Sequence, residues 1–142
     1  MCIRDRFKEV GRIDVYEWAR KHNPIFRENI TKMHQAGVKL ATGTDAGGPV
    51  GFNFQGYNTP WELKIFVEAG LTPLEAIVAA TRKGAEDIGV ADQLGTIEQG
   101  KLADLLILSA NPLENIENIR QIEWVMQGGI MHPRTHFAYK AP

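Results

Sequence analysis

Residues 37–49 read GVKLATGTDAGGP, and this stretch decides the interpretation of the whole chain. A helical pattern ends at Gly37, and residues 38–44 then form a short β-prone run with weak alternation. Two glycines and a proline at residues 47–49 end this predicted strand. Asp45 therefore lies at the carboxyl end of the strand and before a glycine-rich loop, where parallel α/β folds place their active sites.

Asp45 is the strongest positional candidate for a catalytic or metal-binding residue in the chain. Its carboxylate could bind a metal ion or take a proton from a metal-bound water. The more common role of an aspartate at such a position is to accept hydrogen bonds from nearby backbone amides of the turn. Position alone leaves both roles open.

The residues around this stretch predict helices. One short helix covers residues 14–21, and a second begins with Asn23 as cap and Pro24 at its first helical position, ending at Gly37. The loop over residues 46–58 is too long and too aromatic for a simple connector. The aromatic residues in and just after this loop could line a substrate pocket, or they could pack the loop against the rest of the protein. Both alternatives stay open for Phe52, Phe54, Tyr57 and Trp61.

Two further helices begin with the same four-residue pattern. Residues 59–62 read TPWE and residues 72–75 read TPLE. In each, the threonine hydroxyl and the glutamate three residues later can satisfy each other's backbone donors, which predicts two capping boxes. The second helix is expected to continue to residue 89, with Ala85 and Ile88 facing inward.

Beyond residue 89 the pattern changes to short strands. Residues 102–108 predict a nearly continuous apolar strand, and residues 122–126 and 130–132 predict a hairpin across two glycines. Asp104 interrupts the apolar strand, and we expect its carboxylate to accept backbone amide hydrogens from the turn at residues 100–101 rather than to bind a metal. The chain thus divides into a helix–strand–helix part up to about residue 90 and a β-rich part.

Composition excludes several classes of protein. The formal net charge is −1 over 142 residues, which gives no support to binding of nucleic acid or of a membrane surface. No apolar run approaches the roughly 18 residues of a membrane span, and the first residues have no apolar core of a signal peptide, so we expect a cytoplasmic protein. Cys2 is the single cysteine, which excludes an intrachain disulfide and any zinc site built on a cysteine pair.

The four histidines are weaker candidates for metal ligands than Asp45. No two of them have the spacing of a local metal-binding pair, and a proline at position 133 argues against a helix that would bring the last two together. We expect surface or packing roles for His22, His34, His132 and His136.

Three motifs occur in one order along the chain: GVKLATGTDAG at residues 37–47, a segment containing VEAGLTPLEAI within residues 62–81, and GTIEQGKLADL at residues 95–105. Together they resemble the carboxyl-terminal third of the metal-dependent amidohydrolase superfamily, and most closely its imidazolonepropionase-like and Xaa-Pro-dipeptidase-like branch. The resemblance covers residues 24–132. Three ordered motifs are far more specific than any one of them alone.

The resemblance implies an α/β fold in two parts. Residues 11–90 would form the last βα units of a TIM-type (β/α)8 barrel, and residues 91–136 the carboxyl-terminal strands of a small β-sandwich. Asp45 would be both a metal ligand and the group that shuttles the proton of the attacking water. The implied cofactor is one or two divalent metals, usually zinc, and the implied reaction is hydrolysis of an amide or other C–N bond. Small-molecule amides, cyclic amides or dipeptide-like compounds would be the substrates.

Departures from the family pattern define a second expectation. No residue here matches the family's His-x-His pair or its later histidine and modified lysine ligands, so only Asp45 is recognisable, and residues 55–58 read QGYN where relatives often carry a histidine. A complete barrel takes about 250 residues, so this chain alone is expected to be inactive with an incomplete metal site. The alternatives are a non-catalytic α/β binding or scaffolding module, and a subunit completed by a homo-oligomer or by another chain that supplies the missing part of the barrel.

Overall fold

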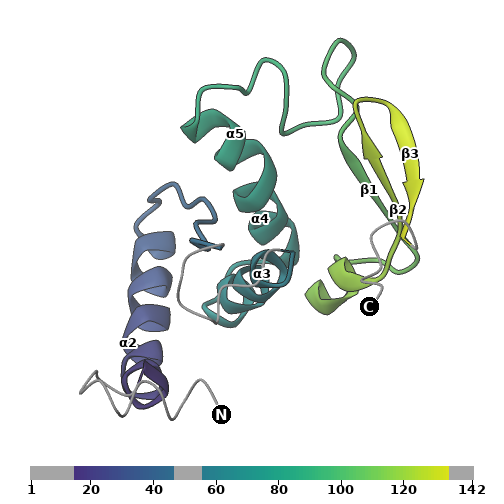
Figure 1. Ribbon diagram of the computed structural model, residues 1–142. Coiled ribbons are helices and arrows are strands. Elements are labelled where there is room, and N and C mark those ends of the chain that lie inside the picture. The colour runs from purple at the N-terminus through teal and green to yellow at the C-terminus, as the bar shows by residue number, and fades with distance from the viewer. Residues whose placement is uncertain (1–14, 47–55, 135–142) are drawn as a thin grey trace.

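The computed structural model describes residues 15–46 and 56–134, with side chains described from residue 21 onward. Helices occupy the first part of the chain and a three-stranded antiparallel sheet the last part, so the α/β expectation is confirmed at this level (Figure 1). Predictions that fall on Cys2, Phe52, Phe54, Gln55 or His136 lie outside the described residues. Among the helices that the structure describes, none is both long and apolar enough to cross a bilayer.

Helix α2 (Val15–Gln35) replaces the two helices predicted for this region. Pro24 lies inside it and costs it one backbone hydrogen bond, because proline has no N–H. The turns after Pro24 hold the helix against the rest of the molecule. The Thr31 hydroxyl donates to the Ala69 carbonyl at 2.7 Å, and Arg27 forms an ion pair with Glu68 at 2.7 Å. The predicted break at Asn23 is therefore wrong.

Helices α3 (Asn58–Glu68) and α4 (Pro73–Val78) begin differently, although the same pattern precedes both. At α4 the predicted capping box is confirmed, because the Thr72 hydroxyl accepts from the Glu75 amide and the Glu75 carboxylate accepts from the Thr72 amide. At α3 the capping box is wrong. That helix begins one residue before Thr59, and Tyr57 is its cap residue without a side-chain capping bond.

A π-helical segment, η1 (Ala79–Lys83), and helix α5 (Gly84–Asp87) continue α4. Ala85 is buried, as the apolar pattern predicts. Ile88 is 73% exposed, so the expectation that it faces inward is wrong. It lies after the last residue of α5, where the helical spacing that placed it on the buried face no longer applies.

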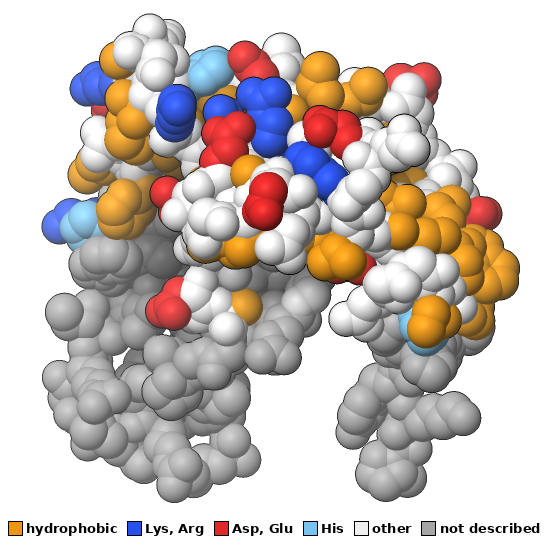
Figure 2. Space-filling view, turned by 90° about the horizontal axis from the view of Figure 1, so that it is seen from above, with side chains coloured by type: hydrophobic (Ala, Val, Ile, Leu, Met, Phe, Trp, Pro, Cys, Tyr) orange, Lys and Arg blue, Asp and Glu red, His pale blue; other side chains and the backbone are white. Residues whose placement is uncertain are grey.

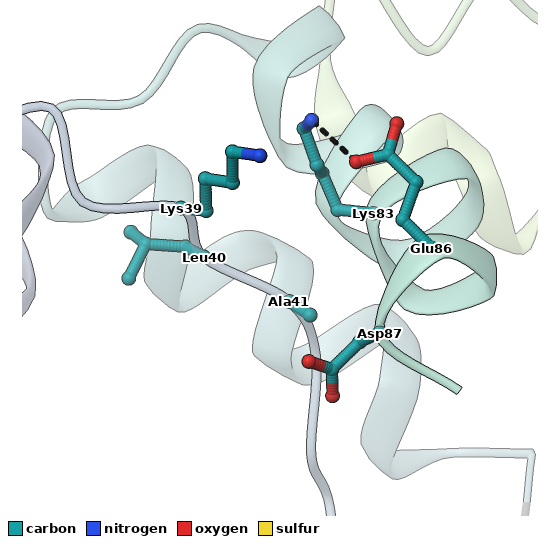
Figure 3. A pocket seen from close by; sticks show the side chains of 6 residues that line it. All are labelled: Lys39, Leu40, Ala41, Lys83, Glu86 and Asp87. Carbon is teal, nitrogen blue, oxygen red and sulfur yellow. Dashed lines mark hydrogen bonds and ion pairs between the residues drawn. The ribbon is translucent and has the colours of Figure 1, made fainter. Parts of the chain in front are cut away.

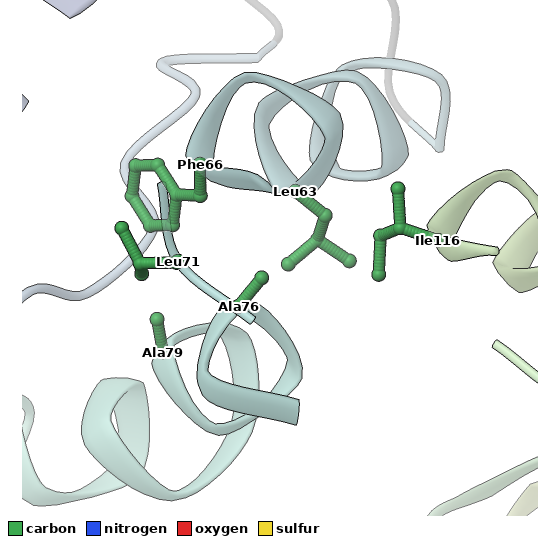
Figure 4. Close-up of a cluster of buried hydrophobic side chains, with 6 residues drawn as sticks. All are labelled: Leu63, Phe66, Leu71, Ala76, Ala79 and Ile116. Atoms are coloured by element: carbon green, nitrogen blue, oxygen red, sulfur yellow. The ribbon is translucent and has the colours of Figure 1, made fainter. Parts of the chain in front are cut away.

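The hydrophobic core joins α3, the α3–α4 connection, α4, η1 and the 3-10 helix η2 (Ile116–Arg120). Figure 4 shows how side chains from these elements converge, with Ile116 directed toward Leu63. Partly buried side chains, among them Ile30 of α2 and Leu40, pack against this cluster. The buried members are Leu63, Phe66, Leu71, Ala76, Ala79 and Ile116.

Strands β1 (Leu105–Leu108), β2 (Ile122–Gln127) and β3 (Ile130–Pro133) form the sheet in that order. The predicted hairpin is confirmed: β2 and β3 pair antiparallel across Gly128 and Gly129, whose φ angles of 55° and 81° suit a tight hairpin turn. Strand β1 is shorter than predicted, because it begins after Asp104.

Asp104 has a different partner from the one predicted. Its carboxylate accepts a hydrogen bond of 2.7 Å from the Gly128 amide, not from the turn at residues 100–101. The register explains this contact, since Leu105 of β1 is paired with Met126 of β2 and the residue before Leu105 therefore lies beside the hairpin turn. Asp104 thus ties β1 to the β2–β3 turn, which agrees with a structural role.

Residues 38–45 are not assigned to a strand. A strand is defined by its ladder of backbone hydrogen bonds. In the described residues this segment instead donates to helical elements, from the Val38 amide to the Met33 carbonyl of α2 at 2.9 Å and from the Thr42 amide to the Ala79 carbonyl at 3.4 Å. Hydrophobic side chains also reach the surface of the molecule over α2 and, separately, over the sheet, as Figure 2 shows. Phe26 is 46% exposed and Leu106 is 51% exposed.

Candidate functional site

Asp45 ends the segment of residues 38–45, beside the start of the glycine-rich stretch. Among the described residues it is the one non-glycine residue with a positive φ, at 49°. Aspartate and asparagine adopt this left-handed conformation several times more often than other side chains do. The residue is exposed to solvent.

The segment before Asp45 is attached to the helices at several points, beginning with a bond of 2.9 Å from the Val38 amide to the Met33 carbonyl of α2. Leu40 packs against the hydrophobic core, and the Thr42 amide donates to the Ala79 carbonyl at the first residue of η1. The polar contact nearest to Asp45 is made by a side chain: the Gly43 amide lies 3.0 Å and 3.1 Å from the two carboxylate oxygens of Glu62 on α3. The backbone two residues before Asp45 is therefore bonded to a helix whose inner face is buried.

Sequence reasoning missed this role of Glu62, because the TPWE pattern assigned its carboxylate to a capping box. The structure uses the carboxylate 19 residues back along the chain instead. Partial burial raises the pKa of Glu62 above its ordinary value, and the hydrogen bond from the Gly43 amide opposes this shift. No signal in the sequence reveals this role. The TPWE pattern at residues 59–62 fails as a capping box because α3 begins at Asn58, and that boundary is known only from the structure.

The described residues do not complete a metal site. Among them no group of three or more histidine, cysteine, aspartate or glutamate side chains could hold a metal ion. The Nε2 atom of His34 lies 3.9 Å from a carboxylate oxygen of Glu75, at the start of α4. His132 lies on β3 in the sheet. Asp45 thus offers one carboxylate of the kind that divalent metals bind, but the described residues do not group three such ligands together.

Two aromatic residues of the predicted set lie at the start of α3. Tyr57 is 51% exposed and Trp61 is 44% exposed. The Arg120 guanidinium lies 4.6 Å from the centre of the Tyr57 ring, and the Lys64 ammonium lies 5.7 Å from that of Trp61. Both rings therefore contact cationic side chains and remain open on one side.

A small surface pocket lies beside residues 39–41, in the segment that leads to Asp45. Figure 3 shows it between Lys39, Leu40 and Ala41 and the turn of η1 and α5. Lys83 and Glu86 form an ion pair of 2.6 Å there, and Lys83 lowers the pKa of Glu86 mainly through this hydrogen bond. Two of the four charged residues that line the pocket, Lys83 and Glu86, are thus satisfied by each other.

Comparison with known proteins places these features in a family. The sequence model of the Amidohydrolase family matches residues 16–131. Ochratoxinase of Aspergillus niger is 39% identical over 102 residues, which cover 67% of this chain and 19% of that enzyme. Imidazolonepropionase of Pyrobaculum arsenaticum is 40% identical over 79 residues, which cover 55% of this chain and 19% of that enzyme.

Solved structures agree with the sequence relatives. The crystal structure of a Xaa-Pro dipeptidase with methionine bound in its active site superposes with a TM-score of 0.70 at 35% identity. The match covers 78% of this chain and 26% of the dipeptidase chain. The present chain therefore spans about a fifth of the length of the curated relatives above and about a quarter of this solved structure.

Proposed function

This chain belongs to the amidohydrolase family, and from that premise we propose that it forms part of the catalytic unit of a metal-dependent hydrolase that cleaves amide or other C–N bonds. The observation that carries the proposal is the place of Asp45, a solvent-exposed aspartate at the end of a segment whose backbone is bonded to α2, α3 and η1. A carboxylate held in this way suits a reaction that needs a fixed acceptor of protons.

Asp45 has two proposed tasks. It supplies one ligand to a site for one or two divalent metal ions, with zinc as the expected metal. Its carboxylate also accepts a proton from the attacking water and returns it to the nitrogen that leaves. At least part of the ligand set has to come from beyond the described residues, because these do not offer a complete set.

The proposed architecture is a TIM-type barrel. In it, residues 38–45 form a barrel strand once the neighbouring strands are present, and β1–β3 belong to a small β-sandwich. Exposed apolar side chains on both parts support completion by further protein, since soluble proteins rarely expose large contiguous apolar surface. That protein is either more of the same polypeptide or another copy or chain, and we propose a cytoplasmic location for the assembly.

The proposed substrates are small molecules with an amide, a cyclic amide or a dipeptide-like bond. Support comes from the relatives, which include an imidazolonepropionase and a Xaa-Pro dipeptidase. Neither activity transfers to this chain as such, because the match covers a minor part of each enzyme.

The test compares two single substitutions. Both are made in the full-length natural polypeptide that contains this chain, loaded with zinc. Asparagine tolerates a positive φ as aspartate does, so Asp45→Asn should keep the fold, measured by circular dichroism, while turnover of Xaa-Pro dipeptides, N-acyl amino acids or cyclic amides falls by about 10²–10⁴-fold. Asp104→Asn is the matched control and should leave turnover unchanged. Full turnover by Asp45→Asn would remove Asp45 from the reaction, and turnover by residues 1–142 alone would show that the chain needs no completion.

A further inference from the structure

We infer that Glu62 is a positioning residue, which fixes the backbone of residues 43–45 and through it the direction of the Asp45 carboxylate. This inference rests on the proposed function, since it takes Asp45 as the reactive carboxylate.

The first support is the geometry of the contact. Both carboxylate oxygens of Glu62 lie within hydrogen-bond distance of one amide, that of Gly43, at 3.0 Å and 3.1 Å. A bond from an amide to a carboxylate is shorter and about twice as strong as a bond between neutral groups. The neighbouring bond from the Thr42 amide to the Ala79 carbonyl measures 3.4 Å. Of the two polar attachments next to Asp45, at Thr42 and Gly43, the one to Glu62 is therefore the stronger.

The second support is the rigidity of the element that carries Glu62. The next residue along α3, Leu63, is 3% exposed, and Phe66 one turn further is 4% exposed. Both belong to the hydrophobic core that also receives Leu40 from the segment itself. The carboxylate of Glu62 thus extends from a packed helix and serves as a fixed point for the Gly43 backbone.

The third support is the conformation that has to be held. Asp45 has a φ of 49°, a left-handed conformation that aspartate adopts more often than most side chains but that still carries backbone strain, so contacts with the surrounding structure help to hold it. Gly43 stands two residues before Asp45, so the position of its amide limits the backbone angles available in between. A displacement of about 1 Å at a reacting group can cost about 100-fold in rate, which makes this attachment matter for catalysis.

The test uses the ¹⁵N-labelled chain of 142 residues without metal or substrate. Glu62→Ala should raise the hydrogen-exchange rate of the Gly43 amide at least tenfold and change the three-bond coupling constant that reports φ at Asp45. Glu62→Gln retains an acceptor oxygen at the same reach and should restore both values to near those of the unsubstituted chain. Glu62→Asp keeps the charge but places it one methylene group further from the Gly43 amide, so it should behave like Glu62→Ala. If the alanine variant fails to fold, the aspartate variant provides the test of the positioning role.

Glu68→Ala is the matched control, because Glu68 lies on the same helix and pairs with Arg27 rather than with the Gly43 segment. It should leave Gly43 and Asp45 unchanged. An unchanged Gly43 exchange rate in Glu62→Ala and Glu62→Asp would overturn the inference. Faster exchange at Gly43 with an unaltered coupling at Asp45 would overturn it too, since the bond would then exist without positioning Asp45.

The outcome is independent of the test of the proposed function. If Asp45→Asn keeps full turnover while Glu62 controls the Asp45 backbone, the proposed function fails and the backbone role of Glu62 stands. If Asp45→Asn is inactive and the Glu62 variants leave Asp45 unmoved, the proposed function stands and the positioning role is wrong. In the active polypeptide, Glu62→Ala should lower kcat with little change in KM, and Glu62→Gln should recover most of the loss.

Discussion

Gly95 is the residue at which a single added carbon has the clearest structural consequence. A Cβ atom there would lie 2.7 Å from the Ala85 Cβ and 3.1 Å from the Thr81 carbonyl oxygen, and the φ of 92° already disfavours any L side chain. Gly95→Ala should therefore lower the free energy of unfolding by about 2–4 kcal/mol, the sum of backbone strain and overpacking. Urea denaturation followed by circular dichroism measures this loss.

Gly100 provides the control for the backbone contribution alone. Its φ of 91° matches that of Gly95, but an added Cβ would meet nothing within 4 Å. Gly100→Ala should thus cost about 1–2 kcal/mol from the backbone term only. Equal losses for the two substitutions would show that Ala85 moves away from the added Cβ atom and that backbone strain alone sets the loss of stability.

At the candidate site, the sequence points to Asp45 but does not reveal the contact between Glu62 and Gly43 that holds the backbone before it. The choice of Asp45 rests on local signals, a β-prone run before it and glycines after it, and its role stays a prediction. The contact between Glu62 and Gly43 joins residues 19 positions apart, and the partner of Asp104 is 24 residues away. Both carboxylates were assigned to nearby amides, because a single sequence contains no information on which distant amide folding brings closer.

Among the elements, α3 and α4 allow the value of a helix cap to be measured within one protein. The Thr72 hydroxyl accepts from the Glu75 amide at 3.2 Å and donates to the Glu75 carboxylate at 2.7 Å, whereas Thr59 lies inside α3 and not at its cap. Thr72→Ala should cost about 1 kcal/mol of stability, and Thr59→Ala less than about 0.5 kcal/mol. Thermal unfolding of the two variants tests this, and similar costs would show that the sequence pattern, not the observed bond, sets the energy.

The elements that could be predicted are those with local causes. The hairpin across Gly128 and Gly129 and the capping box at Thr72 need only neighbouring residues, and both are confirmed. Helix α2 runs through Pro24 because contacts with α3 and the residues after it hold its second half, which no pattern within residues 14–37 reveals. The predicted strand at residues 38–44 needs pairing partners, and the described part of the chain does not provide them.

For the whole molecule, the question is how firmly the β-rich part is attached to the helices. An ion pair between Lys64 of α3 and Glu117 of η2 spans 2.9 Å, but both side chains are more than a third exposed, and such pairs contribute about 0–1 kcal/mol. Ile116, next to Glu117, is 6% exposed inside the helical core. Burial of this one side chain therefore outweighs the ion pair in joining η2, which lies between β1 and β2 in the chain, to α3.

This attachment predicts that residues 15–134 unfold as one unit. Calorimetry should show a single transition, and Ile116→Ala should lower the free energy of unfolding by about 2–5 kcal/mol, because it leaves a cavity next to Leu63. Leu113→Ala is the control: Leu113 precedes η2 and is 50% exposed, so its loss should cost less than about 1 kcal/mol. Two transitions in the unsubstituted chain, or equal effects of the two substitutions, would instead support independent units divided near residue 90, since Ile116 would then not couple the sheet to the helices.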